Sequence, residues 1–166
     1  MEKTFSFITA KGKNLGLGHY QRCISLSKEI ETITKNYIFY VFSDENEKSI
    51  KHKCFFSIED LLRSPKASLF KKTNYLIIDL SFPLFLKYKF VVREWYNFFN
   101  KISETLITID SLGKNSIFHK IPDVKTDLLI LPYISKQKVN MDSKPRILQG
   151  GEYSILSQEY KKKIQI

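Results

Sequence analysis

The sequence contains little cysteine, and its two cysteines, Cys23 and Cys54, have neither redox nor metal-binding spacing. Without a CxxC pair or further cysteines, it has no disulfide framework and no cysteine-based metal motif. No run of about 18 apolar residues occurs, so no segment is predicted to span a bilayer. The N-terminal "MEKTFSFITA" also lacks the apolar stretch and cleavage site of a signal peptide. We therefore expect a cytoplasmic domain in a reducing compartment.

The sequence also has few acidic residues: it contains 17 Asp and Glu residues and 27 Lys and Arg residues, which gives a net charge of +10. This balance is compatible with a nucleic acid, an anionic membrane surface or anionic small molecules. The lysines are mostly scattered, as on a solvated surface. An arginine-rich stripe, an RNP-like aromatic motif and zinc-finger spacing are all missing, which argues against nucleic-acid binding. Charge alone leaves the partner open.

Apolar strands alternate with helical patterns along the whole chain. Hydrophobic residues make up 43% and charged residues 27%, which is typical of a globular domain. Strands are predicted at residues 4–9, 37–43, 54–56, 74–80, 105–110, 127–132 and 146–150. Helices are predicted at residues 19–33, 44–53, 58–63, 83–102 and 152–163. This alternation predicts an α/β fold: one Rossmann-like domain over residues 1–166, with a mostly parallel sheet and helices on both faces.

The predicted helix at 83–102 carries Trp95 and a large aromatic face flanked by lysines. Such a helix could lie on a membrane surface. More often it packs its aromatic face against a sheet, and we favour that interpretation.

The stretch "KGKNLGLG", residues 11–18, forms a glycine loop between the first strand and the first helix. Ligands of open α/β sheets bind outside the carboxyl ends of the strands, where this loop is expected. Its glycines would let a ligand approach the backbone, and the helix N-terminus would favour an anion. A P-loop needs Gly-Lys-Ser/Thr, which is absent, and Gln21 replaces the third glycine of a dinucleotide fingerprint. Both familiar phosphate loops are therefore disfavoured.

What remains is Gly-x-Gly-His at the start of a helix, with Arg22 one turn after His19. The helix dipole favours a neutral imidazole, which could act as a base near pH 7. Arg22 lies on the same helical side and could hold a carboxylate or phosphate. Asp79 and Asp110 each end an apolar strand, where α/β enzymes place working carboxylates. Alternatively, His19 caps the helix, Arg22 pairs on the surface, and the aspartates cap the following loops.

The stretch "GLGHYQRCISLSKEI" resembles the motif GxGHxxRxxxLA of a family of GT-B-fold nucleotide-sugar enzymes. This family includes spore-coat polysaccharide biosynthesis glycosyltransferase-like proteins and the UDP-sugar hydrolase of pseudaminic acid biosynthesis. Further similar stretches follow in the same order: "NYLIIDLSF", "LITIDSLGK", "DLLILPYI" and "LQGGEYSILSQEY". Three positions differ: Ile8-Thr9-Ala10 replaces an Arg-Ala-Asp-like triplet, Asp110-Ser111 replaces an Asp-Asp pair, and no tyrosine follows Asp79.

The resemblance implies half of a GT-B fold, in which residues 1–166 form the N-terminal domain without the second, nucleotide-binding domain. It implies a metal-independent hydrolase or glycosyltransferase of surface polysaccharide biosynthesis, acting on a UDP- or CMP-linked sugar without a cofactor. His19 is implied to be the general base. The residues implied to bind substrate are Gly16, Gly18, Arg22, Asp79, Asp110 and Tyr153. A non-catalytic binding or scaffold subunit of a split glycosyltransferase is the alternative.

Overall fold

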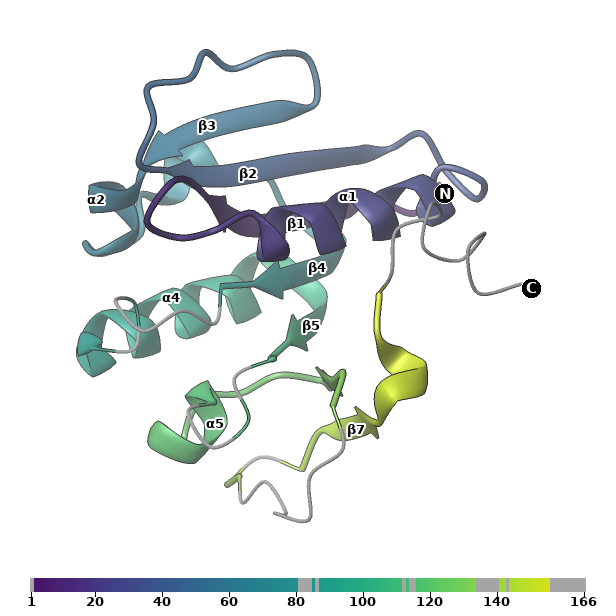
Figure 1. The fold of residues 1–166 in the computed structure, drawn as a ribbon, viewed down its shortest axis with the longest axis vertical. Helices are drawn as coiled ribbons and strands as arrows, with labels where there is room; N and C mark the ends of the chain where they lie inside the picture. The colour runs from purple at the N-terminus through teal and green to yellow at the C-terminus, as the bar shows by residue number, and fades with distance from the viewer. Residues whose placement is uncertain are drawn as a thin grey trace.

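In the part of the chain that the structure describes, seven strands form one parallel sheet (Figure 1). The computed structural model describes residues 2–80, 85, 87–111, 113, 116–133, 141–142 and 144–155. Within them the strand order is β3-β2-β1-β4-β5-β6-β7, and each neighbouring pair is parallel. The predicted α/β, Rossmann-like fold is confirmed.

The observed elements match the predicted strands to within a few residues. The strands are β1 (Phe5–Lys11), β2 (Tyr37–Ser43), β3 (Lys53–Ser57), β4 (Thr73–Asp79), β5 (Ser103–Ile109), β6 (Leu128–Leu131) and β7 (Arg146–Gln149). The α-helices are α1 (Gly18–Ile30), α2 (Ile58–Leu61), α4 (Lys89–Ile102) and α5 (Ile117–Lys120), and the 3₁₀ turns are η1 (Ala67–Leu69) and η3 (Gly151–Tyr153).

Two helix predictions need correction. Residues 44–53 form no helix, because local bonds hold them in turns: the Ser49 hydroxyl accepts from the Phe55 N–H at 2.9 Å, and Ile50 pairs with Lys53. Helix α4 begins at Lys89, because Tyr88 has non-helical angles of φ −105° and ψ 68°. Of the predicted helix at 152–163, the structure describes only residues 152–155, which show the end of η3 and then an irregular segment.

Two apolar clusters lie on opposite faces of the sheet. The cluster under α1 includes Phe7, Cys23 and Phe39, whereas α2, α4 and α5 cover the other face. On that second face Trp95 is buried and its indole N–H donates to the Leu61 carbonyl at 2.9 Å. The aromatic face of α4 therefore packs against the sheet, as favoured above. No helix among the described residues is long and apolar enough to cross a membrane.

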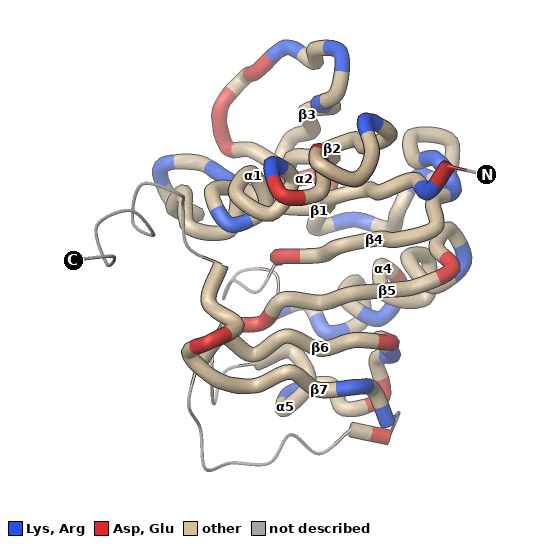
Figure 2. Tube along the Cα trace, turned by 90° about the vertical axis from the view of Figure 1, so that its right-hand side faces the viewer, with Lys and Arg blue, Asp and Glu red and all other residues tan. Residues whose placement is uncertain are grey.

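The strand order reverses between β1 and β4. From β1 the chain passes through α1 to β2 and β3 on one side, and it then returns to β4 on the other side of β1. Because all the strands are parallel, their carboxyl ends share one edge, on the left of Figure 2. Open α/β sheets bind ligands at such a switch point. The glycine loop and the end of β4 both lie there.

Candidate active site at the switch point

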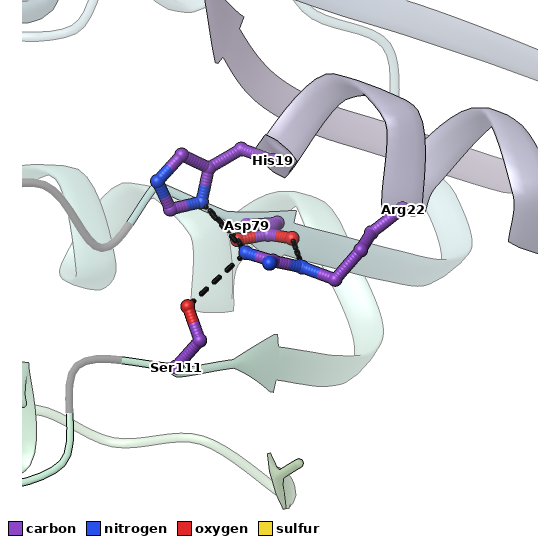
Figure 3. Close-up of polar contacts among 4 residues, drawn as sticks. All are labelled: His19, Arg22, Asp79 and Ser111. Carbon is purple, nitrogen blue, oxygen red and sulfur yellow. Dashed lines mark hydrogen bonds and ion pairs between the residues drawn. The ribbon is translucent and has the colours of Figure 1, made fainter. Parts of the chain in front are cut away.

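Four polar side chains meet at the switch point (Figure 3). The Nδ1 atom of His19 lies 2.5 Å from Oδ1 of Asp79. Arg22 binds the same carboxylate with both prongs of its guanidinium, Nε to Oδ2 at 2.7 Å and Nη2 to Oδ1 at 2.9 Å. Its Nη2 also donates to the Ser111 hydroxyl at 3.2 Å. His19 and Arg22 come from the start of α1, Asp79 ends β4, and Ser111 follows β5.

Simple periodicity brings these groups together. Residues three and four apart on a helix share one face, so His19, Arg22 and Cys23 all point from α1 toward the sheet. Alternate residues of a strand share one face, so Asp79 lies on the same side of β4 as Ile77, which packs in the α1 cluster. A carboxylate at the end of β4 is thereby placed directly under the first turns of α1.

The Arg22 guanidinium supplies the counter-charge for Asp79, whose side chain is 0% exposed. Burial lowers the pKa of Arg22, but the hydrogen bonds and charge of Asp79 outweigh it, so the pKa is raised overall. The arginine therefore stays charged at any physiological pH. A buried carboxylate with such a partner is a fixed hydrogen-bond acceptor.

The short contact to Asp79 assigns a proton to Nδ1 of His19, because an ionised carboxylate can only accept. The second neighbour of Nδ1, Nη2 of Arg22, is farther away at 3.0 Å. In the neutral imidazole the lone pair is then on the other ring nitrogen, Nε2, which points away from Asp79 in Figure 3. The imidazole is 12% exposed. This arrangement presents an oriented proton acceptor at the ligand-binding edge of the sheet.

The structure does not support a capping role for His19. The N-cap of α1 is Leu17, and no side chain caps the helix there. Arg22 likewise pairs with a buried group and not on the surface, since Asp79 is fully buried. The substrate-binding role stays a prediction for Asp79, whose side chain is fully buried. Asp79 holds the histidine and the arginine.

The two predicted glycines border open space beside this cluster. Gly16 has φ 76°, a conformation that favours glycine, and a Cβ atom added there would meet nothing within 4 Å. A Cβ atom at Gly18 would meet only Nη1 of Arg22, at 3.9 Å. A ligand could therefore approach the backbone at both positions.

Asp110 and Tyr153 do not join the cluster. Asp110 is fully buried on the opposite face of the sheet, where its Oδ2 accepts from the Ile117 N–H at 3.0 Å at the start of α5. The structure thus favours the capping alternative for Asp110. Tyr153 lies in η3 after β7, three strands away from β4, and is 36% exposed. In the described part of the chain no hydrogen bond or ion pair links it to His19, and its substrate-binding role stays a prediction.

Sequence reasoning did not assign a role to Ser111. A signal exists, because Ser111 stands two residues after Ile109 and therefore projects to the α1 face, whereas Asp110 projects to the other. Cys23 lies in the core under α1, and burial and then the charge of Asp79 raise the pKa of its thiol. Among the described residues, no group of three His, Cys, Asp or Glu side chains could hold a metal ion.

No family model, curated protein or solved structure matches this chain. The function must therefore be inferred from the site, with the motif resemblance as a guide to substrate class.

Proposed function

We propose that this chain is the sugar- or acceptor-side domain of a cytoplasmic, metal-independent nucleotide-sugar hydrolase or glycosyltransferase, with His19 as its general base. One observation carries the proposal: Nδ1 of His19 is held by a buried aspartate while Nε2 points away from it. Enzymes that activate a hydroxyl with histidine use this arrangement, in which the carboxylate fixes the tautomer and stabilises the imidazolium. The GxGHxxR motif suggests a UDP- or CMP-linked sugar of surface polysaccharide biosynthesis.

The chemistry requires one proton transfer and one bond exchange. Water or an acceptor hydroxyl gives its proton to Nε2 of His19 while its oxygen attacks the anomeric carbon. The bond from that carbon to the phosphate oxygen breaks, and the nucleotide leaves with the electron pair. The imidazolium that forms is stabilised by Asp79, and Arg22 keeps that carboxylate in place.

The departing phosphate needs positive charge. The first turn of α1 has no acidic residue and no side-chain cap, so its backbone N–H groups would be available to an anion. The net charge of +10 would also favour an anionic substrate. A second GT-B domain, which the motif resemblance implies, would supply the remaining nucleotide contacts.

Ligand-observed NMR with a panel of UDP-, CMP- and GDP-sugars tests the proposal, with nucleotide release followed in the same samples. We expect at least one sugar nucleotide to bind and to be turned over. His19→Ala should lower turnover by about 10² to 10⁴, the usual contribution of a general base. His119→Ala changes a histidine on α5, which covers the face of the sheet opposite to α1, and as the matched control it should behave as the wild type.

Two other results are informative. Binding without turnover, weakened by His19→Ala, would favour the binding or scaffold subunit. The proposal fails if no sugar nucleotide binds and His19→Ala behaves as the wild type.

A further inference from the structure

The loop between β1 and α1 is closed into a small ring by its own backbone. The Gly16 N–H donates to the Gly12 carbonyl at 2.9 Å, and the two glycines form an isolated antiparallel bridge. Both have positive φ angles, 150° for Gly12 and 76° for Gly16, which other residues rarely adopt. The chain therefore reaches His19 through a loop of defined shape.

Asp44, the first residue after β2, holds this ring from the neighbouring strand. Its Oδ1 accepts from the Lys13 N–H at 3.1 Å, and its Oδ2 accepts from the N–H and the side-chain amide of Asn14 at 3.0 and 3.1 Å. These bonds, led by that from the Asn14 N–H, hold the pKa of the Asp44 carboxyl below its usual value. A Cβ atom at Gly12 would lie 1.7 Å from Oδ1, so only glycine lets the carboxylate come this close.

The position of Asp44 gives this contact a further meaning. Dinucleotide-binding Rossmann enzymes use an acidic residue near the end of their second strand to bind ribose. Here both carboxylate oxygens at that place are engaged by the glycine loop. The carboxylate is thus committed to the loop that leads into the candidate site.

We infer that Asp44 is a positioning residue, which fixes the glycine loop and thereby the start of α1 and the imidazole of His19. The inference rests on the proposed function only in its last step, the effect on turnover. The rest of α1 is held by buried residues such as Cys23 and Ile30. Loss of the Asp44 hydrogen bonds should therefore disturb the loop and His19 while the fold persists.

The test compares Asp44→Ala and Asp44→Asn with Glu45→Gln. Glu45 is the adjacent exposed carboxylate, and it makes none of the bonds to the loop, so its neutralisation controls for charge. We expect both Asp44 variants to keep the wild-type circular dichroism spectrum. Amide exchange at Lys13 and Asn14 should accelerate by at least ~10-fold in Asp44→Ala. The NMR signals of the His19 ring should shift, and kcat should fall more than KM changes.

A double-mutant cycle sharpens the test. Gly12→Ala should displace the same carboxylate, so the shift of the His19 signals in Gly12→Ala/Asp44→Ala should be smaller than the sum of the two single shifts. Additive shifts, or unchanged amide exchange at Lys13 and Asn14, would overturn the inference that Asp44 holds the glycine loop. Faster exchange with unchanged His19 signals would overturn the positioning role. If no sugar nucleotide binds to the wild type and His19→Ala behaves in the same way, the proposed function fails, but the His19 signals still decide the role of Asp44.

Discussion

Two arginine–aspartate pairs in this protein share nearly the same geometry but lie in opposite surroundings. Arg22 and Asp79 join Nε to Oδ2 at 2.7 Å and Nη2 to Oδ1 at 2.9 Å. Arg93 on α4 and Asp123 after α5 do so at 2.6 and 3.1 Å. In the first pair the aspartate is 0% exposed, and in the second it is 46% exposed. The contacts alone would therefore rank the two pairs as equals.

Burial separates them. Water solvates the exposed pair whether or not it forms, so such pairs contribute little to stability. In the buried pair each partner compensates the charge of the other, and an uncompensated charge in the interior would cost several kcal/mol. The buried carboxylate also has a second neighbour, Nδ1 of His19. One pair can therefore serve chemistry, whereas the other remains a surface contact.

The largest effect is expected for Asp79→Asn. The substitution keeps the shape but leaves the Arg22 guanidinium without its counter-charge. Because Arg22 is 21% exposed, we expect a loss of about 2–3 kcal/mol of unfolding free energy, below the full cost of breaking a buried pair. The asparagine amide can also force the wrong tautomer on His19, so turnover should fall by about 10² to 10⁴.

Urea denaturation and sugar-nucleotide turnover measure the two parts separately. His19→Ala is the matched control, since it should remove turnover while keeping the Arg22–Asp79 pair and most of the stability. Equal, small stability changes for Asp79→Asn and Asp123→Asn would show that burial does not separate the two pairs.

The fold could be predicted from the sequence because apolar strand patterns alternate with helical patterns along the chain, even though the helix predicted at 44–53 does not form. The site could be predicted only in part. A glycine loop before His19 and an aspartate at the end of a strand are visible in the sequence, but Asp79 and Asp110 look alike there. Their difference depends on which face of the sheet each side chain occupies, which follows from strand alternation only once Ile77 and Ile109 are known to face α1.

The contact between Asp44 and the glycine loop could not be predicted from the sequence, for another reason. Asp44 meets the glycine loop across about 30 residues, and no local pattern marks that contact. Residues 44–53 have a polar composition that also suits a helix, but the Ser49 side chain and the Ile50–Lys53 bridge hold them in another conformation. The pairing of β1 with β2 brings Asp44 to the glycine loop.

An intermediate effect is expected for Asp110→Asn, which tests whether the second buried aspartate is structural. The side chain accepts a hydrogen bond from the Ile117 N–H, and an asparagine can replace one oxygen but not the charge. We expect a loss of about 1–2 kcal/mol in unfolding free energy, less than that of a whole charge-assisted hydrogen bond because the asparagine oxygen still accepts, with turnover unchanged. Asp110→Ala should cost more stability and still leave kcat intact. A fall in kcat comparable to that of Asp79→Asn would place Asp110 in the active site after all.

The smallest effect is expected for Asp123→Asn, and its pH dependence makes it measurable. The hydrogen bonds from Arg93 lower the pKa of the Asp123 carboxyl in the folded protein. A lowered folded pKa means that the pair stabilises the fold above the usual carboxyl pKa, and that this contribution is lost as the pH falls through the folded value. The Tm of the variant should therefore lie less than about 2 °C below that of the wild type at pH 7, and the two should converge in acid.

Salt at 1 M should close the same gap in Tm, because exposed charges are screened, whereas the gap for Asp79→Asn should persist. A difference that survives both acid and salt would mean that the exposed pair is coupled to the core, and exposure would then be a poor guide to the value of an ion pair in this fold.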